Sequence, residues 1–428
     1  MHKIIIALLG IALLCSCSRK DDIPEPPTPS AIGERTVIIY MSGENSLTTP
    51  TYNALSADLE EIEKGSTSLS SNQHLIVFID SVGKNAMPHI VEYAKGKRKV
   101  VYEYDSDFYA SDASKFREII EWSMNHYPAE EYGLVLWGHA SGWAVETDTI
   151  ATRAATRAYG YDEGYDTGGS CKSMNITQMA KALEGLPKFK YILADCCNFI
   201  CVESAYELRD AADYLIGSPA EIPSDGAAYD KMMPLLFSHS DTYYRDIADA
   251  YYNYYLEAYK TPLYTEDPDL DFGYVYGYSV PMAVIDLHQM EQLGLATEAA
   301  LSSFIPMAPS DLNLSDLAFY FGSGSSTAMY DMKSVFRKYA SDAVYQAWLT
   351  AFDQAVPYHR FSRAWQTEYT TIYNNFSWLK EDQEADTRYG CVSMYFPQQK
   401  YAYSSYKYNS RIKNYQWYYR MNWAKYGW

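Results

Sequence analysis

Two short apolar segments constrain the fold of this chain more than any other feature. Residues 134–137 (Leu-Val-Leu-Trp) lead through one glycine to His139, and residues 191–194 (Tyr-Ile-Leu-Ala) lead through Asp195 to Cys197. Apolar runs of this length, bounded by turn residues, are typical of the central strands of a parallel sheet. Because ligands bind outside the carboxyl ends of such strands, the pattern predicts that His139 and Cys197 meet in one cleft as base and nucleophile.

Strand-like and helix-like segments alternate over most of the first 260 residues. This alternation predicts right-handed βαβ units, and so an α/β fold with a mostly parallel sheet and helices on both faces. Beyond residue 260 it weakens, and residues 143–172 show no periodicity, which predicts a long loop. The predicted strands are 36–40, 74–81, 89–93, 100–104, 190–195, 214–218, 282–287 and 391–396, and the predicted helices are 51–64, 114–126, 175–186, 201–211 and 331–356.

Composition and charge limit the partners of the chain. Of its 428 residues 48% are hydrophobic, which is typical of a globular protein, and the formal net charge is −19. Phosphate binding requires a basic face, and the sequence contains no cluster of Lys and Arg of that kind. Nucleic acid is therefore excluded as the expected partner.

The first seventeen residues have the pattern of a leader peptide. Lys3 precedes an apolar run, residues 4–14, which is too short to span a bilayer. Leu-Cys-Ser-Cys at 14–17 resembles a bacterial lipobox, which implies cleavage before Cys17 and lipidation of that cysteine. A Pro-rich tether follows at 18–34, and its first residues resemble signals that send lipoproteins to the surface of Bacteroidetes outer membranes. A lipid anchor in the outer membrane is expected, whereas an ordinary secreted protein would leave the cysteine unexplained.

The five cysteines after the leader do not form a disulfide pattern. Their number is odd and three of them lie between residues 196 and 201, whereas disulfide frameworks use dispersed, even sets. Adjacent residues at a strand end point to opposite faces, so one of Cys196 and Cys197 is expected to be packed while the other faces a cleft. Position favours Cys197 as the reactive thiol, which leaves Cys196 as a packed residue or a redox partner.

Several ordered motifs resemble the clostripain-type cysteine peptidases of the caspase-like clan. Residues 134–143 (Leu-Val-Leu-Trp-Gly-His-Ala-Ser-Gly-Trp) resemble the histidine block of that family, residues 191–197 its Asp-Ala-Cys block, and residues 40–47 its first strand and turn. The resemblance implies a caspase-like sheet in a catalytic domain at 35–260. A C-terminal Tyr-rich α+β region is expected at 261–428.

The resemblance also implies roles for four residues. Cys197 is expected to be the nucleophile and His139 the general base, with the N–H groups of Ala140 and Cys197 forming an oxyanion hole. Asp195 matches the carboxylate with which the family selects Arg or Lys at P1, and a carboxylate there suits bidentate capture of a guanidinium. The expected activity is an endopeptidase acting on proteins or peptides with a basic P1 residue. Ala140 and Cys196 stand where the family usually has Gly and Ala.

The loop after His139 contains two candidate sites of self-cleavage. Members of the family often mature by cutting themselves there, and the segment 143–172 contains the triplet Thr-Arg-Ala twice. Arg153 and Arg157 are the central residues of these triplets. The sequence therefore predicts autoprocessing after one of the two arginines.

Metal binding is left open by the sequence. There is no His-Glu-x-x-His and no Cys-x-x-Cys pair, so no metal site is assigned and the expected chemistry requires no cofactor. Calcium is required by some relatives of this type and not by others. The sequence contains no EF-hand-like loop, although Asp162, Glu163 and Asp166 could bind such an ion.

A non-catalytic alternative also fits the leader and the composition. The chain contains 43 tyrosines and nine tryptophans, and aromatic rings of this kind stack on sugar faces in surface lipoproteins that capture glycans or nutrients. That alternative gives no reason for the histidine and cysteine blocks. A pseudo-peptidase is disfavoured because both catalytic positions are filled.

Overall fold

The fold was analysed in a computed structural model of the chain. The leader with Cys17, the two candidate processing residues Arg153 and Arg157, and Asp166 lie outside the residues that it describes. The described residues are 31–49, 52–83, 86–144, 158–164, 171–258, 279–322, 327–362, 364–367, 370–373, 388–402 and 407–428.

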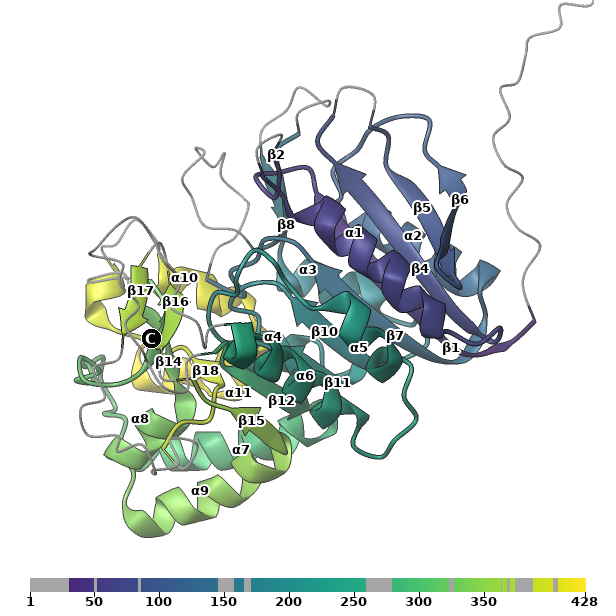
Figure 1. Cartoon of the computed structure of the whole chain (residues 1–428). Helices are drawn as coiled ribbons and strands as arrows, with labels where there is room; N and C mark the ends of the chain where they lie inside the picture. The colour runs from purple at the N-terminus through teal and green to yellow at the C-terminus, as the bar shows by residue number, and fades with distance from the viewer. Residues whose placement is uncertain are drawn as a thin grey trace, which may run out of the picture.

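A mixed sheet forms the centre of the described structure (Figure 1). Its strand order is β15-β12-β11-β10-β7-β1-β4-β5-β6, in which the run from β11 to β4 is parallel and both flanks are antiparallel. The predicted α/β fold with a mostly parallel sheet is confirmed. The strands are β1 (Gly33–Gly43), β4 (Gln73–Ser81), β5 (His89–Ala94), β6 (Lys97–Glu103), β7 (Ala129–Trp137), β10 (Phe189–Asp195), β11 (Ala212–Gly217), β12 (Met282–Asp286) and β15 (Tyr358–Arg360).

Helices cover both faces of the sheet, as predicted. Side chains of β1 alternate between two hydrophobic clusters: Ile38 and Tyr40 pack with α2, α3 and α4, whereas Val37 and Ile39 pack with α1, α5 and α6. Asn175 forms a capping box with Gln178 at the start of α3. The helices are α1 (Ala54–Gly65), α2 (Ala113–His126), α3 (Ile176–Leu183), α4 (Val202–Glu207), α5 (Tyr229–Leu236) and α6 (Tyr243–Ala258).

The segment after the histidine block corrects one prediction. Residues 143–172 were expected to contain no strand, yet Tyr159–Asp162 forms β8, which pairs with β9 (Lys172–Met174). All four residues of β8 are buried, and the hydroxyl of Tyr159 donates to the carbonyl of Tyr40 in β1 at 3.1 Å. The strand is therefore stabilised by packing on the end of β1, and such a contact leaves no local sequence pattern.

The C-terminal region continues the central sheet. β12 and β15 both come from it, so the predicted boundary at residue 260 does not coincide with a sheet edge (Figure 1). No helix of the described residues has the length and apolar character needed to cross a bilayer. The other elements are α7 (Met290–Leu301), α8 (Met332–Tyr339), α9 (Asp342–Ala355), α10 (Tyr408–Arg411), α11 (Gln416–Arg420), β2 (Thr48–Thr49), β3 (Tyr52–Asn53), β13 (Phe319–Phe321), β14 (Ala328–Asp331), β16 (Ala364–Thr367), β17 (Thr370–Tyr373) and β18 (Ser393–Met394).

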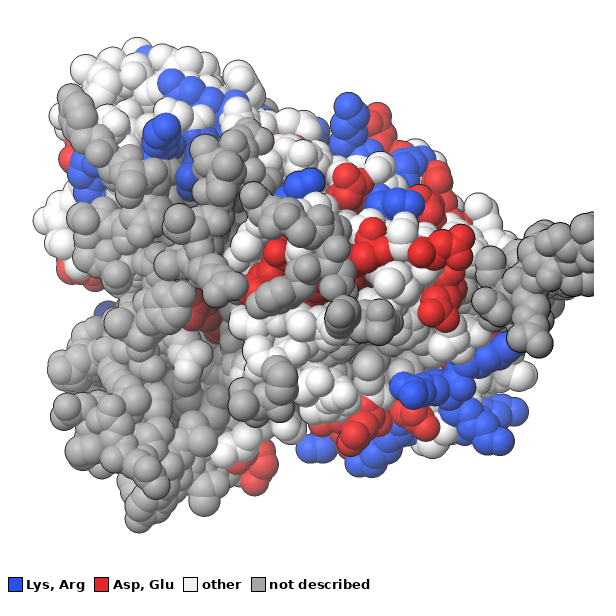
Figure 2. Space-filling model, turned by 90° about the horizontal axis from the view of Figure 1, so that it is seen from above, with Lys and Arg blue, Asp and Glu red and all other residues white. Residues whose placement is uncertain are grey.

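The described surface carries both signs of charge. Figure 2 shows Lys and Arg interspersed with Asp and Glu over the described part of one face. Some charged groups of the described residues pair locally, such as Lys115 with Glu118 on α2. Exposed pairs of this kind contribute little to stability, so the acidic balance of the chain matters mainly for its solubility and partners.

Candidate active site

The histidine and cysteine blocks lie side by side at the carboxyl edge of the sheet. β7 and β10 are neighbouring parallel strands, and their register places Asp195 opposite Trp137. His139 lies two residues after Trp137, and Cys197 lies two residues after Asp195. The two segments therefore leave the sheet side by side. Both side chains line one cavity with a volume of about 90 Å³, and both are half-buried. The structure thus brings together the two residues that the sequence predicted to meet.

The turn that carries His139 depends on a glycine. Gly138 has a φ of +136°, and a Cβ there would lie 2.9 Å from the carbonyl oxygen of Ser42. This close passage past β1 directs the His139 side chain into the cavity. The hydroxyl of Ser46, in the turn after β1, lies 2.9 Å from Nε2 of His139. Ser46 was missed at the sequence level, because nothing in a surface serine indicates such a contact.

Ala140 presents its backbone N–H at the same edge. An antiparallel bridge joins Ala140 to Tyr159 of β8, and the hydrogen bonds of this bridge are made by their neighbours. The bridge therefore does not use the N–H of Ala140, which donates to no other group within the described part of the chain. A backbone N–H without a hydrogen-bond acceptor in the protein is suited to binding an oxyanion.

The two adjacent cysteines differ in environment, as predicted. Cys196 is fully buried, and burial raises the pKa of its thiol well above the ordinary value. Cys197 lines the cavity, and the N–H of Ile222 points to its sulfur at 3.5 Å. The next residue, Asn198, has a φ of +55°, and its amide donates to the carbonyl of Tyr320 at 2.7 Å. The C-terminal region therefore holds the turn that presents Cys197.

Asp195 lies at the wall of the cavity and is almost fully buried. Its carboxylate accepts hydrogen bonds from the hydroxyls of Tyr229 (2.7 Å) and Tyr251 (2.9 Å) and from the N–H of Ala227 (3.1 Å). Burial raises the pKa of Asp195, while these three donors act in the opposite direction and favour the ionised form. The arrangement fixes the carboxylate in one orientation toward the cavity.

A second carboxylate beside Asp195 was missed at the sequence level. Asp58 of α1 accepts a hydrogen bond from Nε1 of Trp137 at 2.5 Å, and burial, with the charge of Asp195, raises its pKa to about 9. Gly226 lies close to both carboxylates, because a Cβ at this position would be 3.0 Å from Asp195 Oδ2 and 3.3 Å from Asp58 Oδ2. The sequence did contain a sign that Asp58 is buried, because it lies between Leu55 and Ile62 on the apolar face of α1.

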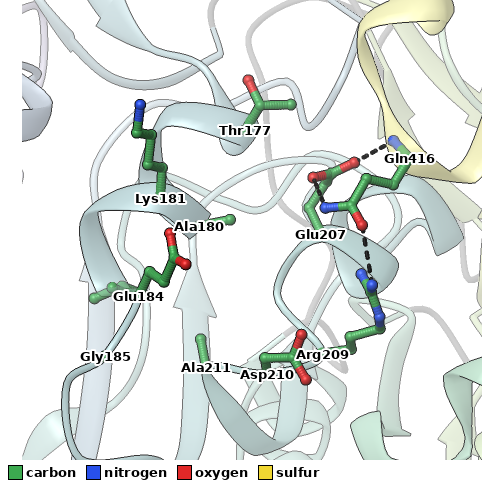
Figure 3. A pocket seen from close by; sticks show the side chains of 11 residues that line it. Thr177, Ala180, Lys181, Glu184, Gly185, Glu207, Arg209, Asp210, Ala211 and Gln416 are labelled. Atoms are coloured by element: carbon green, nitrogen blue, oxygen red, sulfur yellow. Dashed lines mark hydrogen bonds between the residues drawn. The ribbon is translucent and has the colours of Figure 1, made fainter.

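A larger cavity lies elsewhere in the molecule. It has a volume of about 310 Å³ and lies between α3, the turn from α4 to β11, and α11 (Figure 3). Three of its polar residues bond to one another: Gln416 donates to Glu207 through both its backbone and side-chain nitrogens, and Arg209 donates to the Gln416 oxygen at 2.9 Å. It contains no Cys/His pair, so the smaller cavity is the candidate active site despite its size.

The sequence of the chain was compared with known protein families. The model of the Clostripain family (peptidase C11) matches residues 39–428. The chain belongs to the clostripain family. A comparison with curated protein sequences gives no match.

Three solved structures of clostripain-family proteases resemble the chain over most of its length. A secreted C11 cysteine protease from Bacteroides thetaiotaomicron, solved with an irreversible peptide inhibitor, is 25% identical, with a TM-score of 0.71 over 92% of this chain and 99% of that one. An inactive zymogen C11 protease from Parabacteroides distasonis is 24% identical (TM-score 0.69, 92% and 99%). A second secreted protease from B. thetaiotaomicron, iotapain, is 18% identical (TM-score 0.68, 92% and 100%).

Family membership confirms the predicted resemblance and the coarse activity. The clostripain-family chain is a cysteine peptidase, with protein or peptide substrates. This finding favours catalysis over the glycan-capturing alternative.

Proposed function

We propose that this protein is an endopeptidase that cleaves after Arg, and more slowly after Lys, through a dyad of Cys197 and His139. One observation carries the proposal: in a chain of the clostripain family, a thiol, an imidazole and the buried carboxylate of Asp195 line the same cavity. The first two supply the chemistry of peptide cleavage. The third supplies a charge that selects a basic side chain.

The reaction begins with attack of the Cys197 thiolate on the scissile carbonyl carbon. The negative charge then develops on the carbonyl oxygen, next to the N–H groups of Ala140 and Cys197. Each N–H donor in such a position typically stabilises the transition state by about 3 kcal/mol. The unused N–H of Ala140 is therefore suited to the task, and the Ala that replaces the family's Gly preserves it.

His139 transfers the protons. Because Ser46 contacts Nε2, we assign proton transfer to Nδ1, which takes the thiol proton and gives it to the leaving amine as the C–N bond breaks. The product is an acyl-enzyme with a thioester on Cys197. A water then attacks this thioester, His139 accepts the water proton and returns it to the departing sulfur, and the acid product leaves. Ser46 acts here as a positioning residue for the imidazole ring.

Substrate selection is assigned to the pair of carboxylates beside the cavity. A guanidinium that reaches Asp195 passes Gly226, where the missing side chain leaves room for it. Asp58, whose pKa is raised to about 9, is neutral at pH 7. An entering cation lowers that pKa, so Asp58 releases its proton only when a basic side chain is present. Peptides that differ only at P1 (Arg, Lys, Asp or Leu) test this: Arg is expected to be cleaved fastest, and equal rates for Arg and Leu would contradict the proposal.

Self-cleavage in the loop after His139 is part of the proposal. The similarity to a protease described as a zymogen supports it. Ala158, which directly follows Arg157, accepts a hydrogen bond through its carbonyl from the N–H of Ser141, two residues after His139. A cut after Arg157 would therefore release the chain directly beside the active site.

The double variant Arg153→Gln with Arg157→Gln is expected to remain one chain, whereas the wild type separates into two fragments on a denaturing gel. Sequencing of the larger fragment is expected to begin at Ala154 or Ala158. Arg245→Gln, an exposed arginine of α6, serves as the control and should be cut normally. Full activity of an uncut wild-type chain would contradict autoprocessing.

We also infer that the mature protein is anchored to the outer membrane by lipid on Cys17. The lipobox-like segment 14–17 and the Pro-rich tether support this location. Mass spectrometry of the mature N terminus is expected to show acylated Cys17, and Cys17→Ser should release the protein from the membrane fraction. An unmodified N terminus elsewhere in the chain would contradict the anchor.

A further inference from the structure

Two tyrosines of α6 support the side of the candidate active site that carries Asp195. Tyr251 and Tyr255 lie one turn apart, so their side chains extend from the same face of the helix, and both are buried. The hydroxyl of Tyr251 donates to Oδ1 of Asp195 at 2.9 Å, whereas the hydroxyl of Tyr255 donates to the carbonyl of Gly226 at 2.6 Å. The described lining of the cavity includes Asp195 and Gly226 but neither tyrosine. Both tyrosines therefore act on the cavity through the groups that they bind.

The contact of Tyr255 reaches Asp195 through one peptide group. The carbonyl that Tyr255 binds and the N–H of Ala227 belong to the same peptide, and this N–H donates to Oδ2 of Asp195 at 3.1 Å. A hydrogen bond to the carbonyl polarises the peptide and strengthens the donation by its N–H. Gly226 has a φ of +58°, and a glycine leaves the adjoining peptide free to turn over. The turned peptide would point its carbonyl at the carboxylate, and the Tyr255 contact opposes this.

Tyr251 binds the carboxylate oxygen that keeps a site for the substrate. An ionised carboxylate has about four acceptor sites, two on each oxygen. Oδ2 of Asp195 accepts two hydrogen bonds, from Tyr229 and Ala227, whereas Oδ1 accepts from Tyr251 alone among the described residues. One site on Oδ1 is therefore left for a P1 cation. The hydroxyl of Tyr251 fixes the position of this oxygen.

The groups around Asp195 do not ionise at acidic pH. Burial, with the charge of Asp195, raises the pKa of Tyr251 well above its ordinary value, so its hydroxyl keeps the proton that it donates. The other titratable groups that face Asp195 are Asp58 of α1, Tyr159 of β8, Tyr229 of α5 and the thiol of Cys196. Burial raises the pKa of each of them as well. An acidic loss of activity that is confined to peptides with a basic P1 residue therefore reports on Asp195 itself.

We propose that Tyr251 and Tyr255 are positioning residues that set the preference for a basic P1 residue. Tyr251 holds the carboxylate of Asp195 directly, and Tyr255 holds the peptide that donates to it. The inference rests on the proposed role of Asp195 in selecting the substrate. Since neither tyrosine lines the cavity, cleavage of peptides without a P1 charge should hardly depend on them.

Exchange of each tyrosine for phenylalanine removes the hydroxyl and keeps the ring. Tyr251→Phe is expected to lower kcat/KM for Arg peptides about tenfold and for Leu peptides less than about twofold. The lost donor also raises the pKa of Asp195, so Arg cleavage should fail at a higher pH than in wild type. The acidic limb for Leu peptides reports on the Cys/His dyad and should stay in place. Tyr255→Phe is expected to lower the ratio of Arg to Leu cleavage about threefold, mainly through KM.

Tyr252→Phe is the matched control. Tyr252 lies on the same helix and is also buried, but its hydroxyl donates to the carbonyl of Phe361 in the C-terminal region at 2.9 Å. Each of the three variants loses one buried hydrogen bond, so all three are expected to lower the Tm by a similar few degrees. The ratio of Arg to Leu cleavage should stay at the wild-type value in Tyr252→Phe alone.

An unchanged ratio with an unchanged acidic limb in Tyr251→Phe would overturn the proposal, and so would an equal loss of the ratio in Tyr252→Phe. If Tyr251→Phe does not fold, an unchanged ratio in Tyr255→Phe overturns it instead. Asp195→Asn, measured on the same peptides, tests the proposed function separately. An intact Arg preference in that variant would contradict the role of Asp195, whereas a preference lost there and kept in both tyrosine variants would remove only the role assigned to α6.

Discussion

Replacing Cys197 with alanine is expected to lower kcat/KM for an Arg peptide at least about 10⁴-fold. The variant loses the sulfur that forms the acyl-enzyme, and no neighbouring group can replace it as a covalent nucleophile. The fold should persist, because the side chain is half-buried and its described hydrogen bonds are weak contacts of 3.5 and 3.9 Å with Ile222. Initial rates on a fluorogenic Arg peptide measure the loss of activity, and the Tm measures whether the fold persists.

Cys196→Ala is the matched control for this experiment. Its thiol lies in the core with a raised pKa, so it is expected neither to ionise nor to reach substrate, and activity should stay within about threefold of wild type. The same pair of variants identifies the reactive thiol with iodoacetamide, which should label the wild type and Cys196→Ala but not Cys197→Ala at that position. A large loss of activity in Cys196→Ala with an unchanged Tm would reverse the assignment of the nucleophile.

The strands that carry the dyad could be predicted from the sequence because their buried residues follow one another without interruption. β7 and β10 lie in the middle of a parallel run, where both faces are covered, and such strands show as uninterrupted apolar segments. What the sequence could not give is their adjacency. The register of Trp137 with Asp195, which brings His139 and Cys197 to one cavity, is a property of the assembled sheet.

The carboxylates show a different limit. Asp80 is the second-last residue of a buried strand and Asp195 is the last residue of another, yet only Asp195 had a second sign of function, the cysteine two residues later. Asp58 occupies a helix position where the apolar pattern predicts a hydrophobic residue, which marks it as unusual without naming its partner. Its contact with Trp137 depends on how α1 packs on the sheet. Polar residues at apolar positions are therefore worth marking in a sequence, although their partners are set by packing over long distances.

Replacing Asp195 with asparagine is expected to lower kcat/KM for Arg and Lys peptides by about 10²–10³-fold, because a buried charge that pairs with the substrate cation is lost. Peptides with Leu at P1 should be affected little. The variant should fold, since an amide oxygen at the Oδ2 position still accepts from Tyr229 and the N–H of Ala227, while the amide nitrogen can donate to the hydroxyl of Tyr251. Rates on the P1 series, compared with the Tm of each variant, separate specificity from folding.

Asp58→Asn distinguishes the two carboxylates of the pocket. Asparagine still accepts from Trp137, so packing is preserved, and the expected loss on Arg peptides is about tenfold. Activity falls in this variant, but stability at alkaline pH is expected to rise. The pKa of Asp58 in the folded protein, about 9, exceeds its ordinary value of 3.8. The contribution of Asp58 to the stability of the fold is therefore complete below pH 3.8 and is lost as the pH rises through 9. The variant should therefore unfold at a higher temperature than wild type at alkaline pH. If Asp58→Asn impairs Arg cleavage as strongly as Asp195→Asn, both carboxylates bind the cation together; if it has no effect on cleavage, Asp195 alone selects the substrate.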